Sequence, residues 1–154
     1  MRRIYLPLAA VPVMLATATP ALAGETRVEA RGGVYWNSAL NQTDATIGVA
    51  GGYDFDLGPG LFGGLEASAD KVLASGTDVY WGLNSRLGVK ASPNDKIYLV
   101  GGYTLQKGPN AVDAGAGWEH SFGPAYGKVE YKHFFTEGGL PDSNSVSAGI
   151  GLKF

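Results

Sequence analysis

The chain has 154 residues, no cysteine, and 12 basic against 14 acidic residues, giving a formal net charge of −2 at pH 7. This length suits a single domain. Disulfides and thiolate metal sites are excluded by the lack of cysteine, and an acidic chain without basic runs is poorly suited to bind nucleic acid.

Residues 1–23 predict a cleaved secretory signal peptide. Arg2 and Arg3 form a positive start, an apolar run follows, and residues 21–23 (ALA) give an A-x-A cleavage site. Two prolines interrupt the apolar run, which is shorter than the roughly 20 residues that a spanning helix needs. We therefore expect an exported protein whose mature part, residues 24–154, is one domain with 10 basic against 14 acidic residues.

In the mature part, apolar and polar residues alternate in eight segments, which is the pattern of half-buried β-strands. The segments are residues 25–36, 44–55, 61–70, 77–91, 96–105, 111–122, 125–135 and 145–154. Their lengths match the roughly 9–11 residues of a transmembrane strand. All prolines of the mature part fall between the segments, as expected because proline cannot donate to a ladder.

The connections alternate between tight turns and longer polar loops. Residues 56–60, 92–95 and 122–125 form the short set, rich in glycine and proline. Tight periplasmic turns and longer external loops are typical of outer-membrane barrels. The sequence therefore predicts an all-β fold, an eight-stranded antiparallel up-and-down transmembrane β-barrel.

One face of each segment is apolar or small, and the other face carries the charges. The charged face includes Arg27, Glu29, Arg31, Glu66, Arg86, Asp113, Glu119, Lys128, Glu130 and Lys132. A membrane barrel turns such a face inward, whereas a soluble periplasmic lipocalin-like binding barrel turns it outward. In a membrane barrel of this strand number, we expect these side chains to pair across the lumen and plug it.

The aromatic residues favour the membrane barrel because they gather near the strand ends, with aliphatic residues between. This arrangement matches aromatic girdles at two membrane interfaces. We assign to the girdles Trp36, Tyr53, Phe55, Trp81, Tyr103, Trp118 and Phe122. By their position near the tight turns, we also assign Phe62, Tyr98 and Tyr126 to a girdle.

The last segment resembles the C-terminal signature of outer-membrane barrels, which the insertion machinery reads during biogenesis. One face of it carries Val146, Ala148, Ile150, Leu152 and the terminal Phe154. Together with the signal peptide, the repeated GGY (51–53 and 101–103) and the final GIGLKF, this resembles the small outer-membrane β-barrel family that includes opacity-type surface proteins. The resemblance implies a monomer in the bacterial outer membrane, in contact with outer-membrane lipid and lipopolysaccharide. It implies a structural or surface role, and the short loops disfavour adhesion.

Some eight-stranded outer-membrane barrels are lipid A-modifying acyl hydrolases or acyltransferases, which need a histidine with a serine and a carboxylate. His120 adjoins Ser121, but neighbouring strand residues point to opposite faces. His133 lies beside a loop with the polar residues Glu137, Asp142, Ser143 and Ser145. We predict a non-catalytic protein without cofactor, and keep a His133-based enzyme as the alternative.

Metal binding is a weaker possibility, because two carboxylates, Asp54 and Asp56, are too few for a calcium cage. Further acidic residues beside the longer loops could instead recruit divalent cations: Asp44, Asp78, Glu137 and Asp142. We expect these four to be solvated loop residues and predict no metal site.

Overall fold

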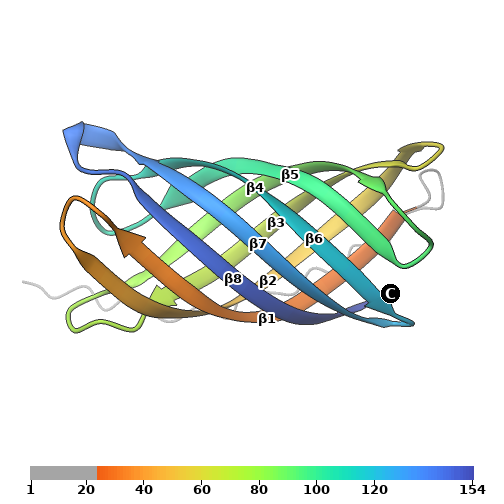
Figure 1. Ribbon diagram of the computed structural model, residues 1–154, viewed down its shortest axis with the longest axis horizontal. Coiled ribbons are helices and arrows are strands. Elements are labelled where there is room, and N and C mark those ends of the chain that lie inside the picture. The colour runs from red at the N-terminus through yellow and green to blue at the C-terminus, as the bar shows by residue number, and fades with distance from the viewer. Residues whose placement is uncertain (1–23) are drawn as a thin grey trace, which may run out of the picture.

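A computed structural model describes residues 24–154, and the predicted signal peptide lies outside the described residues. Eight strands form one closed antiparallel barrel, in which each strand pairs with its neighbours in chain order and the last pairs with the first (Figure 1). The strands are β1 (Gly24–Asn37), β2 (Gln42–Gly58), β3 (Leu61–Val72), β4 (Val79–Lys90), β5 (Asp95–Leu105), β6 (Ala111–Phe122), β7 (Ala125–Thr136) and β8 (Ser143–Lys153). The predicted fold class is confirmed.

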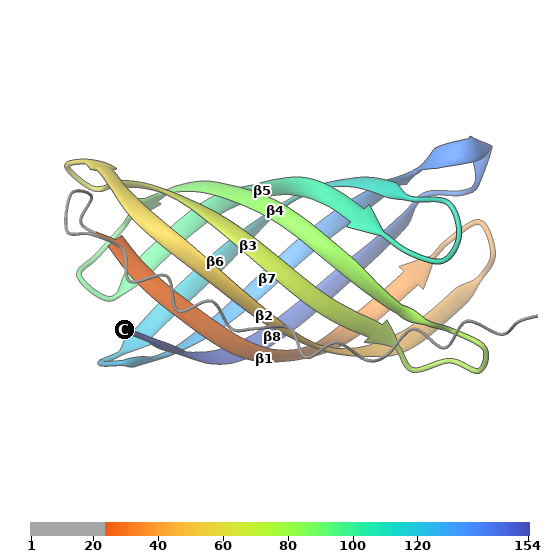
Figure 2. The same cartoon turned by 180° about the vertical axis from the view of Figure 1, so that it is seen from behind.

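The two ends of the barrel differ. The connections β2–β3, β4–β5 and β6–β7 lie at the end that holds the C-terminus, which we call the turn end. The other four connections form the loop end, and the view from behind shows the same separation (Figure 2). One loop contains a short 3-10 turn, Glu137–Gly139. No helix among residues 24–154 is long and apolar enough to cross a membrane.

The tight turns explain where the strands stop. Between β6 and β7, Gly123 has a φ of 72°, a left-handed conformation that glycine adopts at little cost. Pro124 follows it and cannot donate to a ladder. At the β2–β3 turn, strand pairing continues through a register shift between Asp56 and Gly58, so β2 is longer than the predicted segment 44–55.

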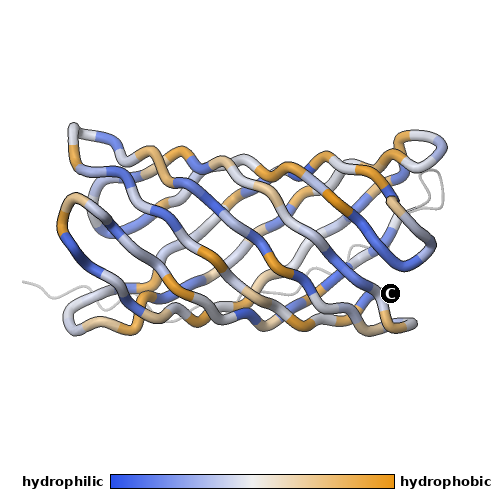
Figure 3. Tube along the Cα trace, viewed as in Figure 1, coloured by the Kyte–Doolittle hydropathy of each residue, from blue (hydrophilic) through white to orange (hydrophobic). Residues whose placement is uncertain are grey.

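Hydrophobic and hydrophilic residues alternate along the strands (Figure 3). On β1, Arg27, Glu29 and Arg31 are buried, whereas Val28 and Val34 between and beyond them are exposed. Ile150 is 70% and Leu99 is 68% exposed on the outside. A continuous apolar exterior of this kind matches lipid rather than water. It is the reverse of a soluble lipocalin-like barrel, which would bury its apolar face.

Candidate functional site

The lumen is filled by charged side chains in equal numbers of each sign. Among residues 24–154, seven buried cations and seven buried anions face inward. They are Arg27, Arg31, Arg86, Lys96, Lys128, Lys132 and Lys153, and Glu29, Asp54, Glu66, Asp70, Asp113, Glu119 and Glu130. All ten predicted lumen residues are in this set. The remaining four, Asp54, Asp70, Lys96 and Lys153, were missed by the sequence analysis.

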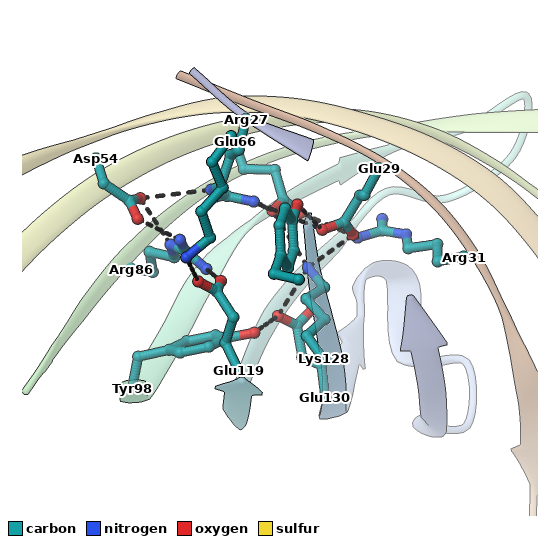
Figure 4. A network of polar contacts seen from close by, with 12 residues as sticks. Arg27, Glu29, Arg31, Asp54, Glu66, Arg86, Tyr98, Glu119, Lys128 and Glu130 are labelled. Carbon is teal, nitrogen blue, oxygen red and sulfur yellow. Dashed lines mark hydrogen bonds and ion pairs between the residues drawn. The ribbon is translucent and has the colours of Figure 1, made fainter. Parts of the chain in front are cut away.

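The arginines of β1 reach across β2 to the carboxylates of β3. Arg31 contacts Asp70 through two hydrogen bonds of 2.7 and 2.6 Å and also contacts Glu66 at 2.9 Å. Arg27 Nη1 donates to Glu66 Oε2 at 2.6 Å (Figure 4). Glu66 therefore joins both arginines.

Small inward residues on β2 make this reach possible. β2 presents Gly48, Ala50 and Gly52 to the lumen on the face between the two charged strands. A Cβ atom at Gly52 would lie 2.8 Å from Arg27 Nη2, and one at Gly48 would overlap Asp70. The glycines thus provide the space through which the side chains of β1 and β3 meet.

A second group of charges lies toward the turn end and centres on Asp54. Arg86 donates two hydrogen bonds to Asp54 and a third, of 2.9 Å, to Glu119. Lys96 Nζ lies 3.0 Å from Asp54, and Lys153 Nζ lies 2.6 Å from Glu119. Asp54, which the sequence analysis placed beside a turn, therefore belongs to the lumen network.

Lysines of β7 complete the network in the middle of the barrel. Lys128 Nζ lies 2.8 Å from Glu29, 3.4 Å from Glu66 and 3.5 Å from Glu130. Lys132 contacts Asp113 at 3.4 Å. Buried charges are tolerated when they are paired and hydrogen-bonded in this way, because pairing offsets their desolvation.

Three aromatic residues that the sequence analysis placed in a membrane girdle lie inside the lumen instead. Phe62, Tyr98 and Tyr126 are 1%, 2% and 0% exposed. Tyr98 donates to Glu130 at 2.8 Å and Tyr126 donates to Glu29 at 2.7 Å. Each lies directly opposite a glycine of the next strand, respectively Gly88, Gly117 and Gly151. The assignment by closeness to a turn was wrong because strand parity puts these residues on the charged face.

Toward the loop end the lumen holds a small polar cavity of about 30 Å³. Arg31, Ser68, Asp70, Thr104 and Lys132 contribute to its wall. Its volume is roughly that of one water molecule. The lumen near it is therefore filled mainly by side chains.

The seven predicted girdle residues all lie on strand positions that face outward. Trp36, Trp81 and Tyr103 are near the loop end, and Tyr53, Phe55, Trp118 and Phe122 are near the turn end. At the turn end, Asp95 Oδ1 accepts hydrogen bonds from Trp118 Nε1 at 3.1 Å and His120 Nδ1 at 2.8 Å. The predicted insertion residues also face outward: Val146, Ala148, Ile150, Leu152 and Phe154. Their role as an insertion signal stays a prediction.

The structure does not assemble a catalytic triad around His133. This side chain faces outward, with Nδ1 2.8 Å from Asn144 Oδ1 and Nε2 3.5 Å from Asp142. Ser143 is buried on the inner face of β8, and Ser145, two residues further on, faces the same side. Among residues 24–154, no group of three His, Asp or Glu side chains is placed to hold a metal ion.

No protein-family model matches the sequence, and no curated protein resembles it significantly in sequence. Solved structures are similar in fold. The attachment invasion locus protein Ail of Yersinia pestis is 10% identical with a TM-score of 0.64, covering 85% of this chain and 97% of Ail. The fold is that of a small outer-membrane barrel.

Two further structures support the same assignment. The N-terminal β-barrel domain of Pseudomonas aeruginosa OprF is 14% identical with a TM-score of 0.62, covering 84% of this chain and 97% of that domain. Neisserial surface protein A is 14% identical with a TM-score of 0.57, covering 85% of this chain and 97% of that protein. The narrower resemblance to opacity-type proteins stays a prediction.

Proposed function

We propose that the protein is a non-catalytic barrel of the bacterial outer membrane, with a lumen closed by its own side chains. It contributes to envelope structure or makes weak surface contacts through its short loops. The observation that carries this proposal is the combination of an apolar exterior with a buried interior of equal positive and negative charge.

The proposal places the loop end outside the cell and the turn end in the periplasm, because outer-membrane barrels have short periplasmic turns. The barrel is a monomer that contacts outer-membrane lipid and lipopolysaccharide and requires the barrel insertion machinery during biogenesis. The closed lumen is supported by the inward aromatic residues Phe62, Tyr98 and Tyr126, which occupy the turn-end half together with Arg86 and its partners.

The alternative of a lipid A-modifying enzyme is not favoured by the position of His133. Its partners are an amide and a carboxylate, and the neighbouring serines belong to the inner face of β8. A nucleophile would have to lie within hydrogen-bond reach of the histidine base.

The test begins with the location and folding of the protein. Inner and outer membranes are separated by density, and the extracted protein is run on SDS gels with and without boiling. We expect an outer-membrane protein whose unboiled band migrates faster than the boiled one. Recovery in the soluble periplasmic fraction with no mobility shift would refute the membrane proposal.

The closed lumen is tested separately in planar lipid bilayers. We expect the refolded protein to give no steady single-channel current at neutral pH. A wide open pore, seen as regular conductance steps in proportion to protein added, would refute the closed lumen while leaving the membrane location intact.

A further inference from the structure

The lipid-facing wall has a hollow across the seam where β8 closes the barrel against β1. The hollow has a volume of about 550 Å³ and a mainly apolar lining. Its floor is made of small residues, Ala30, Gly32 and Ala148, and its sides include Ile47, Leu73 and Ile150. We call it the seam groove.

The sides of the seam groove are formed by protruding side chains on both flanks. Ile150 stands on β8 and is 70% exposed, and Ile47 stands on β2 and is 57% exposed. Leu73, just beyond β3, is held against β2 by a hydrogen bond of 2.7 Å from its backbone N to the carbonyl of Ala45. Small residues opposite one another, Gly32 and Ala148, keep the floor low between them.

A cation lies next to Ile47, on the β3 side of the groove. Lys71 is directly opposite Ile47 on the neighbouring strand and is exposed on the outer face. Among residues 24–154, no carboxylate pairs with it. A lysine at the edge of an apolar belt extends its ammonium toward the polar interface, where it can meet a phosphate.

We propose that the seam groove binds an acyl chain of lipid A and that Lys71 contacts a phosphate of the same molecule. This rests on the proposed membrane location, with the loop end outside, where lipid A forms the outer leaflet. A second copy of the chain fits less well, because a two-fold interface would bring another Lys71 to this face without a carboxylate to pair with it.

The chain offers matched variants for the test. Gly32→Leu fills the floor of the groove; a Cβ there meets its nearest neighbour, the Thr46 carbonyl oxygen, at 3.4 Å. Gly101→Leu is the control, an outward glycine of β5 whose Cβ would lie 3.5 Å from its nearest neighbour. Lys71→Gln removes the charge beside the groove, and Lys107→Gln removes an exposed cation from the β5–β6 loop.

Binding of diphosphorylated lipid A to each refolded protein in detergent is measured by native mass spectrometry, alongside phosphatidylethanolamine and phosphatidylglycerol. We expect Gly32→Leu and Lys71→Gln each to weaken lipid A binding by about fivefold or more, and both controls to bind as wild type. We also expect wild type to prefer lipid A over both phospholipids.

Three results would contradict the proposal in different ways. Unchanged lipid A binding in Lys71→Gln overturns it even if Gly32→Leu does not fold. Equal binding of the phospholipids overturns the assignment to lipid A. A dimer that Gly32→Leu abolishes would make the groove a protein interface. Heat-modifiable migration of the wild type is measured in parallel and shows whether the closed membrane barrel forms. A wild type that is heat-modifiable but does not bind lipid A would overturn only the lipid site and would leave the proposed function intact.

Discussion

Tyr98 of β5 lies directly opposite Gly117 of β6, and its ring covers that glycine inside the lumen. The hydroxyl then reaches Glu130 on β7 at 2.8 Å. Any larger residue at position 117 would occupy the space of the ring, so the glycine is needed for the tyrosine to cross one strand and bond to the next.

Gly117→Ala is therefore expected to destabilise the barrel. An added Cβ would overlap the Tyr98 ring, and overpacking of this kind costs about 1–3 kcal/mol of unfolding free energy. Urea-induced unfolding of the refolded protein measures the change. Gly101→Ala is the control, since its outward Cβ would make only an ordinary van der Waals contact of 3.5 Å and should change the stability by about 1 kcal/mol or less. Equal effects of the two variants would contradict the role of the Tyr98 contact.

Glu66→Gln is expected to cost about 3–5 kcal/mol of stability, because it removes a carboxylate shared by buried cations. Arg27, Arg31 and Lys128 all contact this side chain. The same unfolding assay applies. Asp78→Asn is the matched control: Asp78 pairs with Lys107 at 3.5 Å, but the two side chains are 57% and 79% exposed, and such pairs contribute little. A Glu66→Gln protein as stable as Asp78→Asn would show that the lumen pairs are not needed for stability.

The three tryptophans report where the membrane interfaces lie. Trp36 and Trp81 are near the loop end, and Trp118 is near the turn end. Single-tryptophan variants, with the other two changed to Phe, are refolded into bilayers containing lipids brominated at different depths. We expect the strongest quenching from bromines close to the headgroups for all three. Strongest quenching from bromines at the chain ends would show that the aromatic belts do not mark the interfaces.

His133→Ala is expected to leave lipid A chemistry unchanged. The histidine contacts Asn144 and Asp142, and the nearby serines Ser143 and Ser145 face the lumen instead. Mass spectra of lipid A from cells producing the wild type, the variant or an empty vector are compared. An acylation change that wild type produces and the variant loses would establish the enzymatic alternative.

Much of the barrel follows from the sequence because strand parity is a local property. Alternation located all eight strands, and the ten charged residues that the sequence analysis assigned to the lumen are all buried. Parity would also have found Lys96 and Asp54, since each stands one residue from an outward neighbour, Ile97 or Phe55. The same rule applies to Tyr98, which stands two residues from Lys96. Asp54 and Tyr98 were instead assigned by their closeness to a turn.

The pairing inside the lumen could not be predicted from alternation. Arg31 meets Asp70 on a strand two places away, and this depends on the stagger of the closed barrel and on the lack of a side chain at Gly48, whose place Asp70 occupies. The seam groove likewise depends on residues of three strands and one loop that the closure of β8 onto β1 brings together. Both features depend on the strand register around the whole barrel. The alternation within a single segment does not specify that register.

The equal number of positive and negative side chains in the lumen has a consequence for electrical behaviour. Moving one elementary charge through 100 mV changes its energy by about 2.3 kcal/mol. Among residues 24–154, the seven buried cations and seven buried anions together carry no net charge, so a voltage exerts no net force on this interior as a whole. Neutralising any one of these residues leaves one unit of net charge in the lumen. The barrel then acquires a sensitivity to voltage that the balanced interior lacks.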